Sequence, residues 1–167
     1  IGPDKQTFGF GWGTGTWNLS TWSTPRSTSS VTLDMRQWSI NNWGEDLIVT
    51  QRDGKTYHWN TSDGMTDNRL SVIANAPTSS SLSVVSTETR HLILMGTETT
   101  IGTPSTQDKM FIRFSDQEDF DQFTANATNS AGSQRIAGGS EIRCAKPAKG
   151  TILIWTDTTM HSMSFIG

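Results

Sequence analysis

The chain is poor in the residues that mark several common protein classes. Its one cysteine, Cys144, has no intramolecular partner, so a disulfide scaffold and a cysteine-based structural zinc site are both excluded. No apolar run approaches the length of a membrane-spanning helix, so we expect no membrane partner. No run of basic residues occurs and the net charge is −3, so we expect no specific nucleic-acid partner.

The chain is rich in hydroxyl-bearing residues and correspondingly poor in charged and apolar ones. Hydrophobic residues make up 33% and charged residues 17% of the 167 residues, both below the usual share of a globular domain. The 25 threonines and 20 serines are more than a quarter of the chain. Because threonine fits a pleated strand and serine and glycine fit turns, this composition predicts an all-β protein. The length suits one domain.

The first 30 residues differ from the rest of the chain. Glycines alternate there with aromatic residues, namely Phe8, Phe10, Trp12, Trp17 and Trp22. We expect residues 1–30 to form an arm that packs across a surface or pairs with a neighbour. An aromatic surface for sugar stacking or membrane contact is the alternative. Since the chain begins with Ile1 and no charged-then-apolar leader follows, we also expect it to be processed, or to be part of a longer parent protein.

From residue 31 onward the pattern is one of short strands separated by turns. Asp53-Gly54, between two apolar runs, predicts a hairpin. The best helical candidate is only Gln117–Ala125, one or two turns. The expected strands are Val31–Ile40, Asp46–Thr50, Thr56–Asn60, Leu70–Ala74, Leu82–Val85, His91–Met95, Met110–Phe114, Ile142–Ala145, Thr151–Trp155 and Met160–Ile166.

A weak internal repeat predicts how these strands are grouped. Each unit is an apolar strand, a hairpin and a second strand with an aromatic residue and a following aspartate, and the anchors Leu47, Leu92 and Ile142 lie 45 and 50 residues apart. This spacing is typical of a β-propeller, so we expect about three four-stranded antiparallel blades in residues 31–167. A closed propeller needs at least four blades, so either the chain belongs to a longer propeller or copies close the ring. A β-sandwich is the alternative fold.

The sequence does not mark a catalytic, cofactor-binding or metal site. The acidic residues Asp116, Glu118, Asp119 and Asp121 lack the spacing of a calcium loop, and His58, His91 and His161 lack that of a zinc site. Gly54-Lys55-Thr56 lacks the preceding glycine of a phosphate-binding loop. The neighbouring carboxylates Glu45 and Asp46 point to opposite faces of a strand. We therefore expect a protein that is not an enzyme and has no cofactor; a carboxylate-based hydrolase is a less favoured alternative.

Seven residues are candidate structural anchors. The tryptophans Trp38, Trp43, Trp59 and Trp155 lie in or beside expected strands, and we expect them to pack in the core, above all Trp43 and Trp155. The alternative is a set of exposed tryptophans that bind carbohydrate. Asp46, Asp116 and Asp157 are expected to cap turns with their side chains.

Several segments of the sequence resemble segments of the proteins of one family. They are Trp38-Ser-Ile-Asn-Asn-Trp-Gly-Glu-Asp-Leu-Ile-Val, Ala74–Pro77, Arg90–Ile93, Arg113–Asp119, Ala127–Arg135 and Leu153–Thr158. Together, across residues 38–167, they are similar to virion structural proteins of tailed bacteriophages, of the neck, tail-nozzle or packaged-DNA-stabilisation type. The resemblance implies a propeller-rich protein of the virion that forms homo-oligomers, contacts other virion subunits and has no catalytic residues. Members are much longer, which implies that this chain is a piece or a short relative.

Overall fold

The computed structural model describes residues 5–7, 30–32, 37–64 and 69–166, and the chain divides into two compact units, Ile1–Arg36 and Gln37–Gly167. In the first unit β1 (Lys5–Thr7) pairs antiparallel with β2 (Ser30–Thr32). The unit boundary therefore lies after Arg36 and not after residue 30, because Ser30–Thr32 pair with the N-terminal strand. The glycine- and aromatic-rich residues 8–29 of the expected arm lie outside the described residues.

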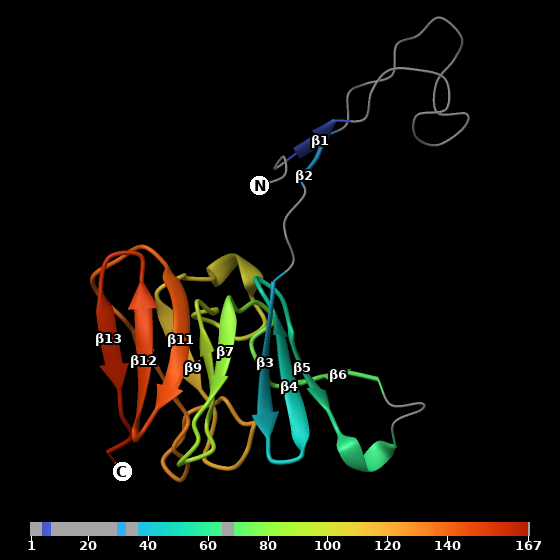
Figure 1. Ribbon diagram of the computed structural model, residues 1–167, viewed down its shortest axis with the longest axis vertical. Helices are drawn as coiled ribbons and strands as arrows, with labels where there is room; N and C mark the ends of the chain where they lie inside the picture. Colours follow the sequence, from blue (N-terminus) through green and yellow to red (C-terminus); the bar gives the residue numbers. More distant parts are fainter. Residues whose placement is uncertain (1–4, 8–29, 33–36, 65–68, 167) are drawn as a thin grey trace, which may run out of the picture. The chain divides into compact units, whose positions relative to one another are not determined.

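The second unit consists of three antiparallel sheets that follow one another along the chain (Figure 1). The first sheet is β3 (Trp38–Trp43), β4 (Asp46–Gln51), β5 (Thr56–Trp59) and β6 (Ser71–Val72). The second is β7 (Leu82–Val85), β8 (Leu92–Met95), β9 (Phe111–Phe114) and β10 (Gly132–Arg135). The third is β11 (Ile142–Ala148), β12 (Thr151–Thr156) and β13 (Met160–Met163). Within each sheet, consecutive strands are neighbours.

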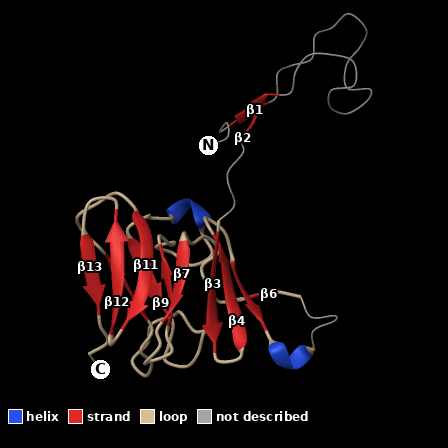
Figure 2. Cartoon of the chain, in the orientation of Figure 1, coloured by secondary structure: helices blue, strands red, loops and turns tan. Residues whose placement is uncertain are grey.

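The sheets are arranged like successive blades of a propeller. The first strand of the middle sheet, β7, contacts the first strands of both other sheets, β3 and β11 (Figure 1). The only helical elements among the described residues are the short 3-10 turns η1 (Thr61–Asp63) and η2 (Pro104–Thr106), drawn in blue in Figure 2. The predicted all-β, antiparallel, propeller-like fold is thus confirmed. Two sheets have four strands and the third has three.

Two hydrophobic clusters hold the three sheets together, and β8 contributes to both. Leu92 and Leu94 pack with Trp43 and Ile48 of the first sheet and with Phe123. Ile93 and Met95 point the other way and pack with a cluster that includes Ile142, Ala145, Ile152 and Ile154 of the third sheet. Because both faces of the middle sheet are covered, all four residues of β8 are buried. This explains the unbroken apolar run Leu92–Met95.

Polar contacts from the β4–β5 hairpin reach both other sheets. Asp53, at a φ of 55°, accepts hydrogen bonds from the Ser81 hydroxyl and the Gln107 amide and forms an ion pair with Lys109. Arg52 forms an ion pair with Glu141, directly before β11, at 2.5 Å between Nη2 and Oε1. The expected Asp53-Gly54 hairpin forms, and its loop joins the sheets as well as the two strands.

Some expected elements differ from those observed. The strand expected at Val31–Ile40 differs in its bounds, because Gln37 is not in a strand and β3 begins at Trp38 and runs to Trp43. The edge strand β10 was not expected, since Gly132–Arg135 contains no apolar residue. Residues 117–125 form turns and bends in place of helix.

The internal repeat is out of register in the third sheet. Its first two units are the second and third strands of their sheets, β4–β5 and β8–β9, whereas the third unit is β11–β12, the first and second strands. The sequence pattern of an apolar hairpin is the same whichever two neighbouring strands of a sheet it forms. The spacing of the repeat units along the chain therefore did not reveal this shift.

The two tryptophans of β3 provide a test of this packing. Trp43 is 6% exposed and Trp38 is 47% exposed. We expect Trp43→Ala to cost about 3–5 kcal/mol of unfolding free energy, because it opens a cavity between the first and second sheets. Trp38→Ala is expected to cost about 1 kcal/mol or less. Urea unfolding of both variants measures the difference, and equal losses would contradict the assigned faces of β3.

Candidate functional site

The face of the first sheet that points away from the second sheet carries a nearly continuous apolar surface. Strand register places Ile40 of β3 opposite Val49 of β4, and Val49 opposite Tyr57 of β5, which in turn lies opposite Val72 of β6. Side chains opposite one another lie on one face of a sheet. We call this surface the outer face of the first sheet; it comprises Trp38, Ile40, Asn42, Leu47, Val49, Gln51, Tyr57, Trp59 and Val72.

This outer face has large apolar side chains in solvent and carries no charge. Ile40 is 63% exposed, and Trp38 and Val72 are each 47% exposed. The Trp38 and Tyr57 rings lie 6.3 Å apart, inclined at 48°. Contiguous exposed apolar patches of this kind mark surfaces that bind a partner. None of the other described residues of the second unit forms a hydrophobic cluster with it.

The predicted tryptophan anchors are divided between core and surface. Trp43 is in the core, where Arg90 lies 5.3 Å over its ring and the Phe120 ring meets it edge-on at 5.6 Å. Trp38 is not a core residue, contrary to expectation. The two are separated by five positions, an odd number, so they point to opposite faces of β3. Trp59 shares the outer face with Trp38 and is half-buried.

Trp155 is also placed differently from the expectation. It is half-buried and lies between Ile154 and Thr156, which point toward the second sheet. Trp155 therefore points to the opposite face of the third sheet and belongs to neither core cluster. The core positions of this strand are Ile152 and Ile154, which alternate with it.

The three predicted aspartate anchors bind serine or threonine in the same way. Each accepts hydrogen bonds from the backbone N–H and from the hydroxyl of a single residue. Asp46 accepts both from Thr61 at 3.0 Å. Asp116 accepts them from Ser130 at 2.8 and 2.7 Å, and Asp157 from Ser140 at 2.9 and 2.6 Å.

These hydrogen bonds lower the pKa of all three aspartates. The main cause is the backbone N–H of Thr61 for Asp46 and that of Ser130 for Asp116, while for Asp157 it is the Ser140 hydroxyl. Charged carboxylates with two donors each hold strand ends and loops together and are not free to act as acids or bases at neutral pH.

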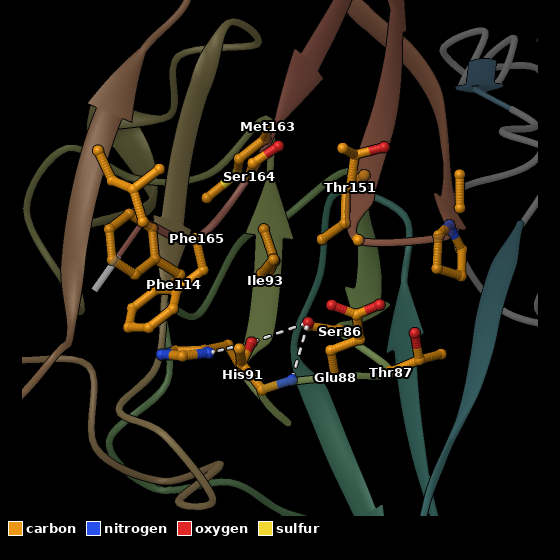
Figure 3. Close-up of a pocket in the computed structure, with 16 residues that line it drawn as sticks. Ser86, Thr87, Glu88, His91, Ile93, Phe114, Thr151, Met163, Ser164 and Phe165 are labelled. Atoms are coloured by element: carbon orange, nitrogen blue, oxygen red, sulfur yellow. Dashed lines mark hydrogen bonds between the residues drawn. The ribbon is translucent and has the colours of Figure 1, made fainter.

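A cavity of about 270 Å³ lies between the second and third sheets (Figure 3). Ile93, Ile152 and the buried His91 are among its lining residues, and Figure 3 shows Phe114 and Phe165 on one side with Glu88 and Thr151 on the other. Ligand sites usually measure about 300–1,000 Å³, so this cavity lies just below that range. No sequence pattern predicts this cavity, since its lining comes from strands distant in the chain.

His91 belongs to a hydrogen-bonded chain that ends on a carboxylate. The Ser130 hydroxyl donates to Asp116, so it accepts from Nε2–H of His91 at 3.0 Å. Nδ1 of the neutral ring is then an acceptor, and the Thr89 hydroxyl donates to it at 2.7 Å. Burial lowers the pKa of His91 more than the negative charge of Asp116 raises it.

The order of this chain is not that of a serine nucleophile. In a nucleophilic triad the histidine removes the serine proton and the acid orients the histidine. Here Ser130 lies between His91 and Asp116, so its proton is held by the carboxylate. Such an arrangement joins β8 to the loop before β10 and leaves no activated hydroxyl.

The other residues considered as catalytic or metal-binding candidates also form contacts within the protein. Asp121 accepts hydrogen bonds from Asn75, and Asp119 accepts one from the backbone of Asp121. His58 of β5 contacts Asp46, His161 of β13 contacts Thr159, and His91 directly precedes β8, so the three histidines lie in or beside three different sheets. Within the described ranges, no group of three or more His, Cys, Asp or Glu residues could hold a metal ion. Thr56 of Gly-Lys-Thr is buried against Thr50.

Comparisons with known proteins do not add a family to this description. No family model, no curated protein and no solved structure matches the chain. A search of the described residues finds no helix long and apolar enough to cross a membrane.

The buried His91 predicts a pH dependence of stability. Its pKa in the folded protein lies below the ordinary value of about 6.5, so the unfolded chain binds the proton first as the pH falls. The contribution of His91 is complete above about pH 6.5 and is lost as the pH falls through its folded pKa. The aspartates, whose pKa values are also lowered, lose theirs only below about pH 3.8.

We expect urea unfolding to show a lower stability at pH 5 than at pH 7.5, and a smaller difference in His91→Gln. An NMR titration of the His91 ring in the unaltered protein gives an independent reading. A ring that titrates at or above pH 6.5 in the folded state would contradict the prediction.

Proposed function

We propose that the chain is a non-enzymatic structural module of a bacteriophage virion, in the neck or tail, which acts by packing against neighbouring subunits. The observation that carries the proposal is the outer face of the first sheet. Its apolar residues cover all four strands, and Ile40 is 63% exposed. The resemblance of residues 38–167 to virion structural proteins of tailed phages supplies the setting.

The cost of leaving this face in water supports an assembly role. Burial of apolar surface is the main favourable term in most protein association, at about 25 cal/mol per Å². A sheet face with no charged side chain avoids the large free-energy cost of burying a charge. The opposite face of the same sheet is already covered by the second sheet. The outer face is therefore suited to receive another sheet in the same manner.

The chemistry of the polar residues supports a role without catalysis. Asp46, Asp116 and Asp157 are each occupied by two donors from one residue. His91 is satisfied at both ring nitrogens. Catalytic groups are usually kept available to a substrate at hydrogen-bond distance.

A charge placed on the outer face tests this proposal. We expect the purified chain to scatter light as a species heavier than its 18.4 kDa monomer, and Ile40→Glu to return it to the monomer. Ala125→Glu, which puts the same charge on an exposed loop, is the matched control and should leave the mass unchanged. A chain that is monomeric with and without Ile40→Glu, at all accessible concentrations, would argue against assembly through this face.

A carbohydrate-binding module is the second candidate, and one observation favours it. Trp38 and Tyr57 lie side by side on the outer face with rings 6.3 Å apart, and Trp38 is 47% exposed. Exposed aromatic rings of this kind can stack on the apolar faces of sugars. The same surface would then bind a glycan in place of a protein.

Fluorescence quenching separates the two candidates. If the module binds carbohydrate, iodide should quench Trp38, a bound glycan should protect it, and Trp38→Ala should remove both the protected signal and glycan binding. A glycan array without a specific signal, or protection that persists in Trp38→Ala, would count against the carbohydrate module and leave the assembly role.

A further inference from the structure

A second partly apolar face lies at the other end of the series of sheets. Strand register places Cys144 of β11 opposite Trp155 of β12, and Trp155 opposite Met160 of β13. Met160 is 61% exposed and Cys144 is exposed. We call this surface the outer face of the third sheet; it comprises Cys144, Lys146, Leu153, Trp155, Met160 and Ser162.

The contacts within the chain show how one sheet follows another. Between the first and second sheets, β3 meets β7, where Ser39 and Asn41 hydrogen-bond to Ser83. Between the second and third sheets, β7 meets β11, with Val84, Ile142 and Ala145 in one cluster. In both cases first strand packs beside first strand. A sheet that continued the series after the third would therefore place its first strand beside Cys144 and Lys146.

We propose that a second copy of this chain covers both faces, so that the first sheet of each copy packs on the third sheet of the other. The inference rests on the proposed assembly role and names the partner and the two surfaces. The packing of first strand beside first strand then occurs at two interfaces between the copies. At each of them, β3 of one copy lies beside β11 of the other. The result is a closed ring of six sheets with a two-fold axis through its centre.

The number of sheets favours two copies over other assemblies. Propellers typically close with four to eight blades. The described residues of the second unit contribute three sheets per copy, so two copies fall within that range and three do not. One copy leaves two faces uncovered, and three copies would place nine sheets in the ring. Pairing of two identical first-sheet faces would leave both third-sheet faces exposed and close nothing.

The two faces are also compatible in charge. The outer face of the first sheet has no charged residue, and that of the third carries Lys146, with Arg143 exposed beside Cys144 where the register of β11 shifts. The contact therefore opposes no like charges. The series places Lys146 near Trp38 or Ile40, and an ammonium group beside an indole ring is a favourable contact.

A cross-linking experiment with separate copies tests this arrangement. Cys144 is the single cysteine of the chain, so one partner is the unaltered protein. The other partner carries Cys144→Ser together with one of three changes along β3, namely Trp38→Cys, Ile40→Cys or Asn42→Cys. The two proteins are mixed and treated with a short bis-maleimide, and any covalent pair must then join different copies.

We expect a covalent dimer that links Cys144 to at least one of the three β3 positions. Its yield should exceed that of Ala125→Cys with Cys144→Ser by at least about tenfold, because an interface holds two thiols at a millimolar effective concentration. Light scattering of the unaltered protein should give twice the monomer mass, and peptide mass spectrometry identifies the joined positions.

Other outcomes overturn the inference in distinguishable ways. Equal yields for the β3 variants and the Ala125→Cys control overturn the interface. A trimer or larger assembly that Ile40→Glu disperses, or a β3 cysteine that joins only its own kind, overturns the two-copy ring and leaves the assembly role standing. A monomer at all concentrations overturns both.

Discussion

The structure depends on one constraint, which is that a sheet with two apolar faces needs a neighbour on each side. The middle sheet meets it within the chain, since Leu92 and Leu94 pack against the first sheet and Ile93 and Met95 against the third. The two end sheets meet it on one side only. Ile40 at one end and Met160 at the other are therefore exposed, and the same physics that builds the core leaves two surfaces suited to association.

The polar residues described above position these sheets through hydrogen bonds and ion pairs. The β4–β5 loop binds the second sheet's loops through Asp53 and the start of β11 through Arg52. The three aspartates each hold a serine or threonine by its N–H and hydroxyl, and the hydrogen-bonded chain from Thr89 to Asp116 passes through His91. In this serine- and threonine-rich chain, many hydroxyl groups thus form hydrogen bonds that hold loops in place. Such fixed loops are compatible with the proposed structural role.

We propose the exposed sheet faces, and not the cavity, as the functional surfaces. The cavity is about 270 Å³, and its histidine already has partners on both nitrogens. The outer face of the first sheet extends over four strands and has no charge to keep it in water. The apolar area that a partner could cover there is the larger source of binding free energy.

The sequence by itself determined the fold class and most strands, because the threonine- and serine-rich composition, the short apolar runs and the Asp53-Gly54 turn are local properties of the chain. It also identified Asp46, Asp116 and Asp157 as residues of interest, although their partners Thr61, Ser130 and Ser140 lie 14 to 17 residues away in the chain. Only the tertiary structure decided which face of each strand is inside. Trp38 and Trp43 share one strand and one residue type, yet packing against the second sheet buries one and leaves the other in solvent. Strand β10 and the cavity around His91 likewise depend on contacts between distant segments, which no local pattern encodes.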